Sequence, residues 1–102
     1  MNMNDLMKQA QQFQEKLSTV QQQLAQQTVT GAAGAGMVTA TLNGNGELLS
    51  LKIEPEIVNP DDVQMLQDLV TAAVNDGLRK AKDAGKAEMG KLTGGLNIPG
   101  LF

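Results

Sequence analysis

The first thirty residues contain neither glycine nor proline, and this uninterrupted stretch constrains the fold more than any other feature. Apolar residues recur there in steps of three and four, at Met3, Leu6, Ala10, Phe13, Leu17, Val20 and Leu24. This spacing predicts a helix with these residues at the a and d positions of about three heptads. Asn4 or Asp5 is the predicted N-cap. Glutamines fill much of the remaining helix surface, and glutamine is a good helix former. Because the heptad pattern is intact, we interpret these glutamines as a solvated helix face and not as an aggregation-prone tract.

The segment after this helix is predicted to be extended. Thr28–Thr30 is β-prone and is followed by the small residues of Gly31–Gly36, which allow a tight bend or a close backbone approach. The glycine spacing also suggests a phosphate-binding loop. That alternative requires a Gly-Lys-Ser/Thr ending, or a helix after the loop. A strand follows here instead, so the pattern favours a structural role.

Two alternating stretches around Gly44-Asn45-Gly46 predict a β-hairpin. The expected inward residues are Val38, Ala40 and Leu42 on the first strand and Leu49, Leu51 and Ile53 on the second. The expected outward residues are Thr39, Thr41, Ser50, Lys52 and Glu54. A hairpin with one apolar face is marginal alone, so a helix or a second subunit must cover it.

Pro55 ends the hairpin, and Asn59-Pro60 is predicted to open a second helix with Asn59 as N-cap. A broad apolar stripe follows, made of Val63, Leu66, Leu69, Val70, Ala73, Val74, Gly77, Leu78 and Ala81. Within this stripe Ala73, Gly77 and Ala81 lie four apart, so we expect Gly77 to face another element at close range. Gly85 weakens the helix, which is expected to fray before Gly90, and residues 93–102 are predicted to form an irregular tail.

The residue types that are missing restrict chemistry. The 102-residue chain has no His and no Cys, so the commonest general base, thiol nucleophile and zinc ligands are absent. Neither Ser18 nor Ser50 lies in a Gly-x-Ser-x-Gly context. We therefore expect no enzyme, no cofactor, no metal and no small-molecule substrate. Met1–Leu6 resembles no signal peptide and the apolar runs are short, so the expected location is cytoplasmic, with no membrane contact.

The predicted core is thin, because Phe13 and Phe102 are the only aromatic residues. Apolar faces are predicted on both helices and on the sheet. Their combined apolar surface exceeds what a single domain of this size can readily bury by itself. Together with the heptad seam of Met3–Leu24, this predicts a homodimer.

The net charge of −3 argues against a protein that coats nucleic acid non-specifically. DNA binding would therefore require basic residues that are concentrated locally. Five of the eight basic residues cluster in the second helix, at Arg79, Lys80, Lys82, Lys86 and Lys91. Arg79, Lys82 and Lys86 lie within roughly 60° of one another on a helix. The alternative is a solvated face on which Asp76 and Asp83 form intrahelical ion pairs with these cations.

Four stretches carry a family resemblance. They are residues 3–11, the strand pair from Gly36-Met37-Val38 through Leu42-Asn43-Gly44 to Leu51-Lys52-Ile53, the helix Asp68–Asp76 followed by Arg79-Lys80, and the ending Leu92–Leu96 with Pro99-Gly100. In this order they resemble the YbaB/EbfC family of bacterial nucleoid-associated proteins, over nearly the whole chain.

This resemblance implies an α+β fold of the order α-β-β-β-α, in which an antiparallel sheet is flanked by two long helices. It also implies an intertwined homodimer with protruding helices that binds double-stranded DNA with low sequence specificity in the cytoplasm or nucleoid. Nucleoid organisation, gene regulation and repair are the processes it suggests. It places DNA contacts on the helices without specifying residues. The candidate DNA-binding residues are therefore the basic residues of the two predicted helices, Arg79, Lys80, Lys82, Lys86, Lys91, Lys8 and Lys16. The alternative function is a protein-interaction adaptor that uses the helices or the Leu96–Phe102 tail.

Overall fold

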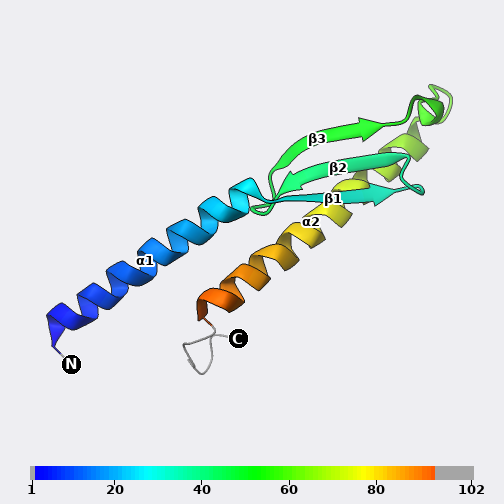
Figure 1. Cartoon of the computed structure of the whole chain (residues 1–102). Coiled ribbons are helices and arrows are strands. Elements are labelled where there is room, and N and C mark those ends of the chain that lie inside the picture. Colours follow the sequence, from blue (N-terminus) through cyan, green and yellow to red (C-terminus); the bar gives the residue numbers. More distant parts are fainter. Residues whose placement is uncertain (1, 94–102) are drawn as a thin grey trace.

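A computed structural model describes residues 2–93 of the chain (Figure 1). Its elements are α1 (Met3–Gln26), β1 (Thr28–Ala33), β2 (Val38–Asn43), β3 (Leu48–Ile53), the short 3-10 helix η1 (Pro55–Ile57) and α2 (Val63–Thr93). This order confirms the α-β-β-β-α prediction. The predicted tail is tested only at Thr93, which belongs to α2, and residues 94–102 lie outside the described part.

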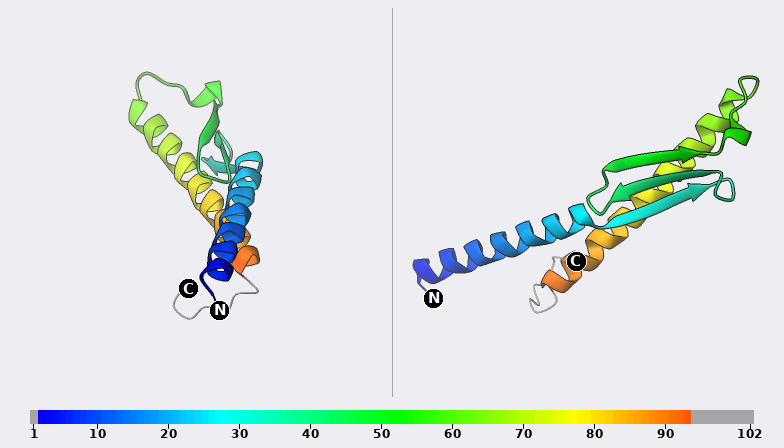
Figure 2. Two further views of the ribbon diagram at one scale, coloured as in Figure 1. Left: turned by 90° about the vertical axis from the view of Figure 1, so that its left-hand side faces the viewer. Right: turned by 45° about the horizontal axis from the view of Figure 1, so that its top comes forward.

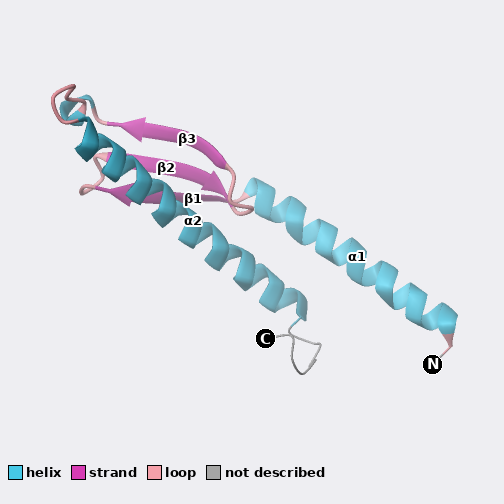
Figure 3. Cartoon of the chain, turned by 180° about the vertical axis from the view of Figure 1, so that it is seen from behind, coloured by secondary structure: helices cyan, strands magenta, loops and turns pink. Residues whose placement is uncertain are grey.

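The three strands form one antiparallel sheet in the order β1-β2-β3. Helix α2 crosses one face of this sheet, over β1 and β2 (Figure 3). Val38, Ala40 and Leu42 of β2 point toward α2 and are completely buried, and Ala73 of α2 is buried against them. The alternation predicted for β2 is therefore confirmed, and it forms the centre of the core.

Glycines allow α2 to lie directly against β1. Gly31 and Gly77 are both buried, and a Cβ atom on Gly31 would lie 2.7 Å from the Cα of Gly77, closer than real contacts allow. The expected close approach at Gly77 is confirmed. The expected bend is also present, at Gly34–Gly36, where all three residues have φ between 55° and 86°. Strand β1 extends to Ala33, beyond the predicted end at Thr30.

The predicted helix ends were wrong by a few residues. Asn2 caps α1, because its side chain accepts the N–H of Asp5 at 2.9 Å. Asp62 accepts the N–H of Met65 at 3.2 Å and caps α2, while the side chain of Asn59 is occupied by the turn that precedes the helix.

The predicted fraying before Gly90 was also wrong, because α2 continues to Thr93. An interior helical glycine costs about 1 kcal/mol. Packing of the last turns of α2 against α1 offsets this cost, and one such contact is the hydrogen bond from Gln27 to Glu88 at 3.4 Å.

The prediction that β3 buries its inward residues was wrong for Leu49 and Leu51, whereas Ile53 is half-buried against the core. Leu49 remains 55% exposed and Leu51 39% exposed, and Leu48 beside them is 50% exposed. The reason is the position of α2, which covers β1 and β2 and leaves the β3 side of the same face open (Figure 1).

Helix α1 projects from the sheet and gives the molecule extents of 69 × 24 × 16 Å. It lies beside the C-terminal half of α2, and the two helices run in opposite directions (Figure 2). Only the last part of the heptad seam is covered, since Val20 and Leu24 are buried whereas Leu6 is 50% and Met3 75% exposed.

Candidate nucleic-acid interface

The outer face of α2 carries three of the predicted DNA-binding residues. Ala73, Gly77 and Ala81 fix the side of α2 that faces the sheet. At 100° per residue, Arg79, Lys82 and Lys86 lie roughly 140–200° around the helix from Gly77. All three are exposed. The structure therefore brings together the three cations that the sequence grouped, and directs them away from the sheet.

Asp76 connects this region to β1. It forms the predicted ion pairs, with Arg79 Nη2 at 3.0 Å and with Lys80 Nζ at 3.3 Å. Its Oδ2 also accepts the N–H of Ala32 at 3.0 Å, and Lys80 donates to the carbonyl of Thr30 at 2.8 Å. The Ala32 N–H, and after it the Lys80 ammonium, hold the pKa of Asp76 below its ordinary value.

The sequence did not reveal that these two side chains bond the backbone of β1. A strand at the edge of a sheet presents unpaired backbone groups. Asp76 and Lys80 satisfy two such groups on β1, so Lys80 is turned toward the sheet and away from the outer face of α2. Arg79 is shared between Asp76 and solvent, with its side chain 69% exposed.

The predicted ion pairs of Asp83 with Arg79 and Lys86 do not form. Arg79 is held by Asp76, and an exposed pair gains too little energy to fix a long Lys side chain. Among residues 2–93, neither Lys82 nor Lys86 has an ion-pair partner. Among the cations of α2, these two are thus the most available for an external anion.

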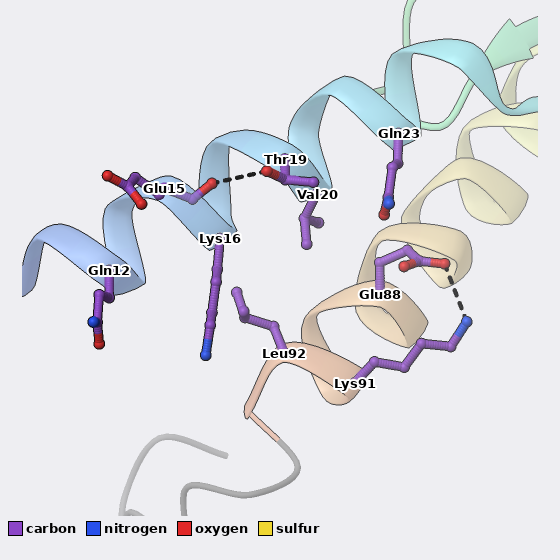
Figure 4. Close-up of a pocket in the computed structure, with 9 residues that line it drawn as sticks. All are labelled: Gln12, Glu15, Lys16, Thr19, Val20, Gln23, Glu88, Lys91 and Leu92. Atoms are coloured by element: carbon purple, nitrogen blue, oxygen red, sulfur yellow. Dashed lines mark hydrogen bonds and ion pairs between the residues drawn. The ribbon is translucent and has the colours of Figure 1, made fainter. Parts of the chain in front are cut away.

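The remaining predicted residues lie elsewhere. Lys16 of α1 and Lys91 of α2 line a hollow of about 780 Å³ between the two helices (Figure 4). Lys91 extends along α2 to Glu88, with 3.3 Å between Nζ and Oε1. Lys8 is exposed two turns further out on α1. The seven residues therefore form no single cluster.

Charge is segregated along the molecule. The stretch from Glu54 to Asp68 holds five acidic and no basic residues, and the stretch from Asp76 to Lys91 holds five basic and three acidic residues. The first lies at the end of the sheet that carries η1 and the start of α2, and the second begins beside β1 and continues along the C-terminal half of α2 (Figure 1). Asp68 and Lys86 are about 27 Å apart along the helix, which is about three Debye lengths at physiological salt. The acidic run was visible in the sequence, but its separation from the basic run required the fold.

Residues 2–93 show neither a group of three or more potential metal-ligating side chains nor a helix long and apolar enough to cross a membrane.

Comparisons with known proteins identify the family of this chain. The sequence model described as the YbaB/EbfC DNA-binding family matches residues 1–96. A protein of Desulfotalea psychrophila named as nucleoid-associated is 54% identical over 99% of this chain and 95% of its own length. Another with that name, from Caldanaerobacter subterraneus, is 54% identical over 99% of this chain and 91% of its own.

Among solved structures, an uncharacterized protein from Helicobacter pylori has the same fold. Its TM-score is 0.81 at 24% identity, and the match covers 90% of this chain and 97% of that one.

Proposed function

We propose that this chain, which belongs to the YbaB/EbfC DNA-binding family, binds duplex DNA with low sequence specificity through the outer face of α2. The observation that carries this proposal is the segregation of charge along α2. Among residues 2–93, Lys82 and Lys86 have no ion-pair partner, and they lie about 21 and 27 Å along the helix from Asp68. Phosphate contacts carry no sequence information, so unrelated duplexes should bind alike. Lys8, Lys16 and Lys91 extend the surface along the arms, whereas Lys80 contributes only if it releases β1.

The proposed binding form is a homodimer, which doubles this small set of cations. Its interface is the uncovered β3 side of the sheet, where Leu48, Leu49 and Leu51 are exposed. The outer edge of β1 is already bonded by Asp76 and Lys80, so β3 is the edge left for a partner. Exposed apolar residues that adjoin an open strand edge are a typical association surface. The corresponding location is the cytoplasm or nucleoid, with a role in DNA organisation, regulation or repair and no catalytic activity.

The test is fluorescence anisotropy with two unrelated duplexes at two salt concentrations. The logarithm of the affinity should fall with the logarithm of salt concentration, with a slope of about −0.9 for each phosphate contact. Both duplexes should give the same slope, and the affinity should be about micromolar or weaker at physiological salt.

Replacing Arg79, Lys82 and Lys86 together by Gln should weaken binding to both duplexes and flatten the slope. Lys52 on the sheet provides a matched control, because Lys52→Gln and Lys86→Gln remove the same charge from exposed positions. Only Lys86→Gln should reduce affinity. Unchanged binding by a folded triple variant would refute the proposed surface, and binding that ignores salt would favour the adaptor function.

A further inference from the structure

An apolar groove separates the outer part of α1 from the C-terminal end of α2. It joins the hollow described above to a second one of about 630 Å³, and Gln12, Lys16 and Leu92 line both. The apolar lining of the second hollow is Leu6, Ala10, Phe13 and Leu92. Gln9, Gln12 and Lys16 complete its lining. We call the two hollows together the interhelical groove.

This groove exists because α2 ends before α1 does. The heptad seam of α1 is buried at Val20 and Leu24 and half-buried at Leu17 and Phe13. Toward its N-terminus the seam is open, with Leu6 50% exposed. Burial of a Leu or Phe side chain is worth roughly 1.5–3 kcal/mol, so a segment that covers this part of the seam gains substantially.

We propose that residues 94–102 of the same chain occupy the interhelical groove and run from Leu92 toward the N-terminal end of α1. This segment follows α2 directly, and the helix residue Leu92 lies in the groove at the point where the segment starts. It contains Leu96, Ile98, Leu101 and Phe102 and no charged side chain. Its composition therefore matches the second hollow, where Lys16 is the single charged residue among the seven that line it.

The length of the segment fits the groove. Along α1, Phe13 and Met3 are about 15 Å apart. Nine residues reach up to about 30 Å when extended. The segment can therefore cross the open part of the seam and still make one turn, which Gly94-Gly95 permits.

The glutamines of α1 suit this occupant. Pro99 and three glycines oppose continuation of the helix, so an extended backbone must find hydrogen-bond partners outside itself. Gln9 and Gln12 line the groove, and each amide supplies both donors and an acceptor. An uncharged polar side chain can pair with backbone groups without the desolvation cost of a charge.

Cysteine pairing tests the proposal, because the chain has no native cysteine. Gln9 and Gln11 are both exposed glutamines on α1, but only Gln9 lines the groove. The test compares Gln9→Cys/Asn97→Cys with Gln11→Cys/Asn97→Cys in a glutathione redox buffer without DNA. Disulfide formation in the Gln9 pair should be favoured at least tenfold over the Gln11 pair. Equal disulfide formation in the two pairs overturns the proposal.

Two further measurements identify the occupant and its driving force. Mixing ¹⁵N-labelled and unlabelled protein before oxidation separates links within a chain from links between chains. Links found exclusively between chains overturn occupancy by the same chain. Replacing Leu96, Ile98 and Leu101 by Ser in the Gln9→Cys/Asn97→Cys protein should remove the tenfold preference. If the preference persists, apolar docking is refuted. DNA binding enters none of these measurements, so their outcome is independent of the proposed function.

Discussion

Substitution of Gly31 by Ala tests the packing on which the orientation of α2 depends. The added Cβ atom would meet the carbonyl oxygen of Ala73 and the backbone nitrogen of Gly77, and would lie 2.7 Å from the Cα of Gly77. All three are backbone atoms, so no side chain can rotate to make room. Ordinary contacts require about 3.4 Å or more, so α2 must move away from β1 by roughly 1 Å. The van der Waals contacts between α2 and β1 would then lose about a quarter to a half of their energy.

The expected cost is about 2–3 kcal/mol, at the upper end of what overpacking a core usually costs. Gly31 has no positive φ, so Ala regains about 0.4–1 kcal/mol by restricting the unfolded chain. This gain is smaller than the cost. The net loss is about 1–2.6 kcal/mol. The melting temperature should therefore fall by roughly 4–20 °C, since 1 kcal/mol corresponds to about 4–8 °C in a domain of this size.

The assay is thermal unfolding followed by circular dichroism at one fixed protein concentration, because association would otherwise alter the midpoint. Gly85→Ala is the matched control. Gly85 also lies in α2, but a Cβ atom there meets nothing within 4 Å. It should stabilise by about 0.5–1 kcal/mol, the helix propensity gain alone. A Gly31→Ala protein as stable as the wild type would refute the inferred contact.

Three further predictions concern charge and association. Asp76→Asn should lower the melting temperature more at pH 7 than at a pH below about 3.9. A lowered pKa stabilises the fold fully above the unfolded value of about 3.9, and this stabilisation is lost as pH falls through the folded value. Equal losses at both pH values would contradict this. The wild-type protein should have a mass of twice 10.8 kDa by light scattering, and Leu51→Asp should halve this mass. Ser50→Asp, on the opposite face of the sheet, should leave the mass unchanged. A wild-type monomer at micromolar concentration would exclude the dimer. Asp83→Asn should raise DNA affinity about two- to fivefold, because it removes an acid within a Debye length of the cations. Asp68→Asn should have no measurable effect on DNA affinity. An equal gain in affinity for the two variants would show that net charge controls binding.

Much of the fold could be predicted because its signals are local. The alternation of Val38, Ala40 and Leu42 predicted their common face, and the spacing of Ala73, Gly77 and Ala81 predicted a close contact. Both patterns follow from the periodicity of a strand or helix. The order of a helix, a short strand, a hairpin and a second helix also followed from local patterns, and it agrees with the observed order of elements.

The exposure of Leu49 and Leu51 could not be predicted in the same way. Their alternation indicates a face, but burial depends on where α2 crosses the sheet, and no local pattern states this. The role of Asp76 was hidden for a similar reason. Its spacing to Arg79 and Lys80 predicts ion pairs, whereas its bond to Ala32 joins residues 44 positions apart. Long-range contacts of this kind separated Lys80 from the other cations.

The small-residue stripe and the basic face of α2 belong to one arrangement. Close contact at Gly31 and Gly77 fixes the rotation of α2 about its own axis, because any turn of the helix would place larger side chains against β1. That rotation directs Lys82 and Lys86 away from the sheet. Helix α2 is about 46 Å long. It therefore begins at the acidic end of the sheet and carries Lys82 and Lys86 well beyond that end. A chain with net charge −3 can therefore offer DNA a locally basic surface without any excess of basic residues.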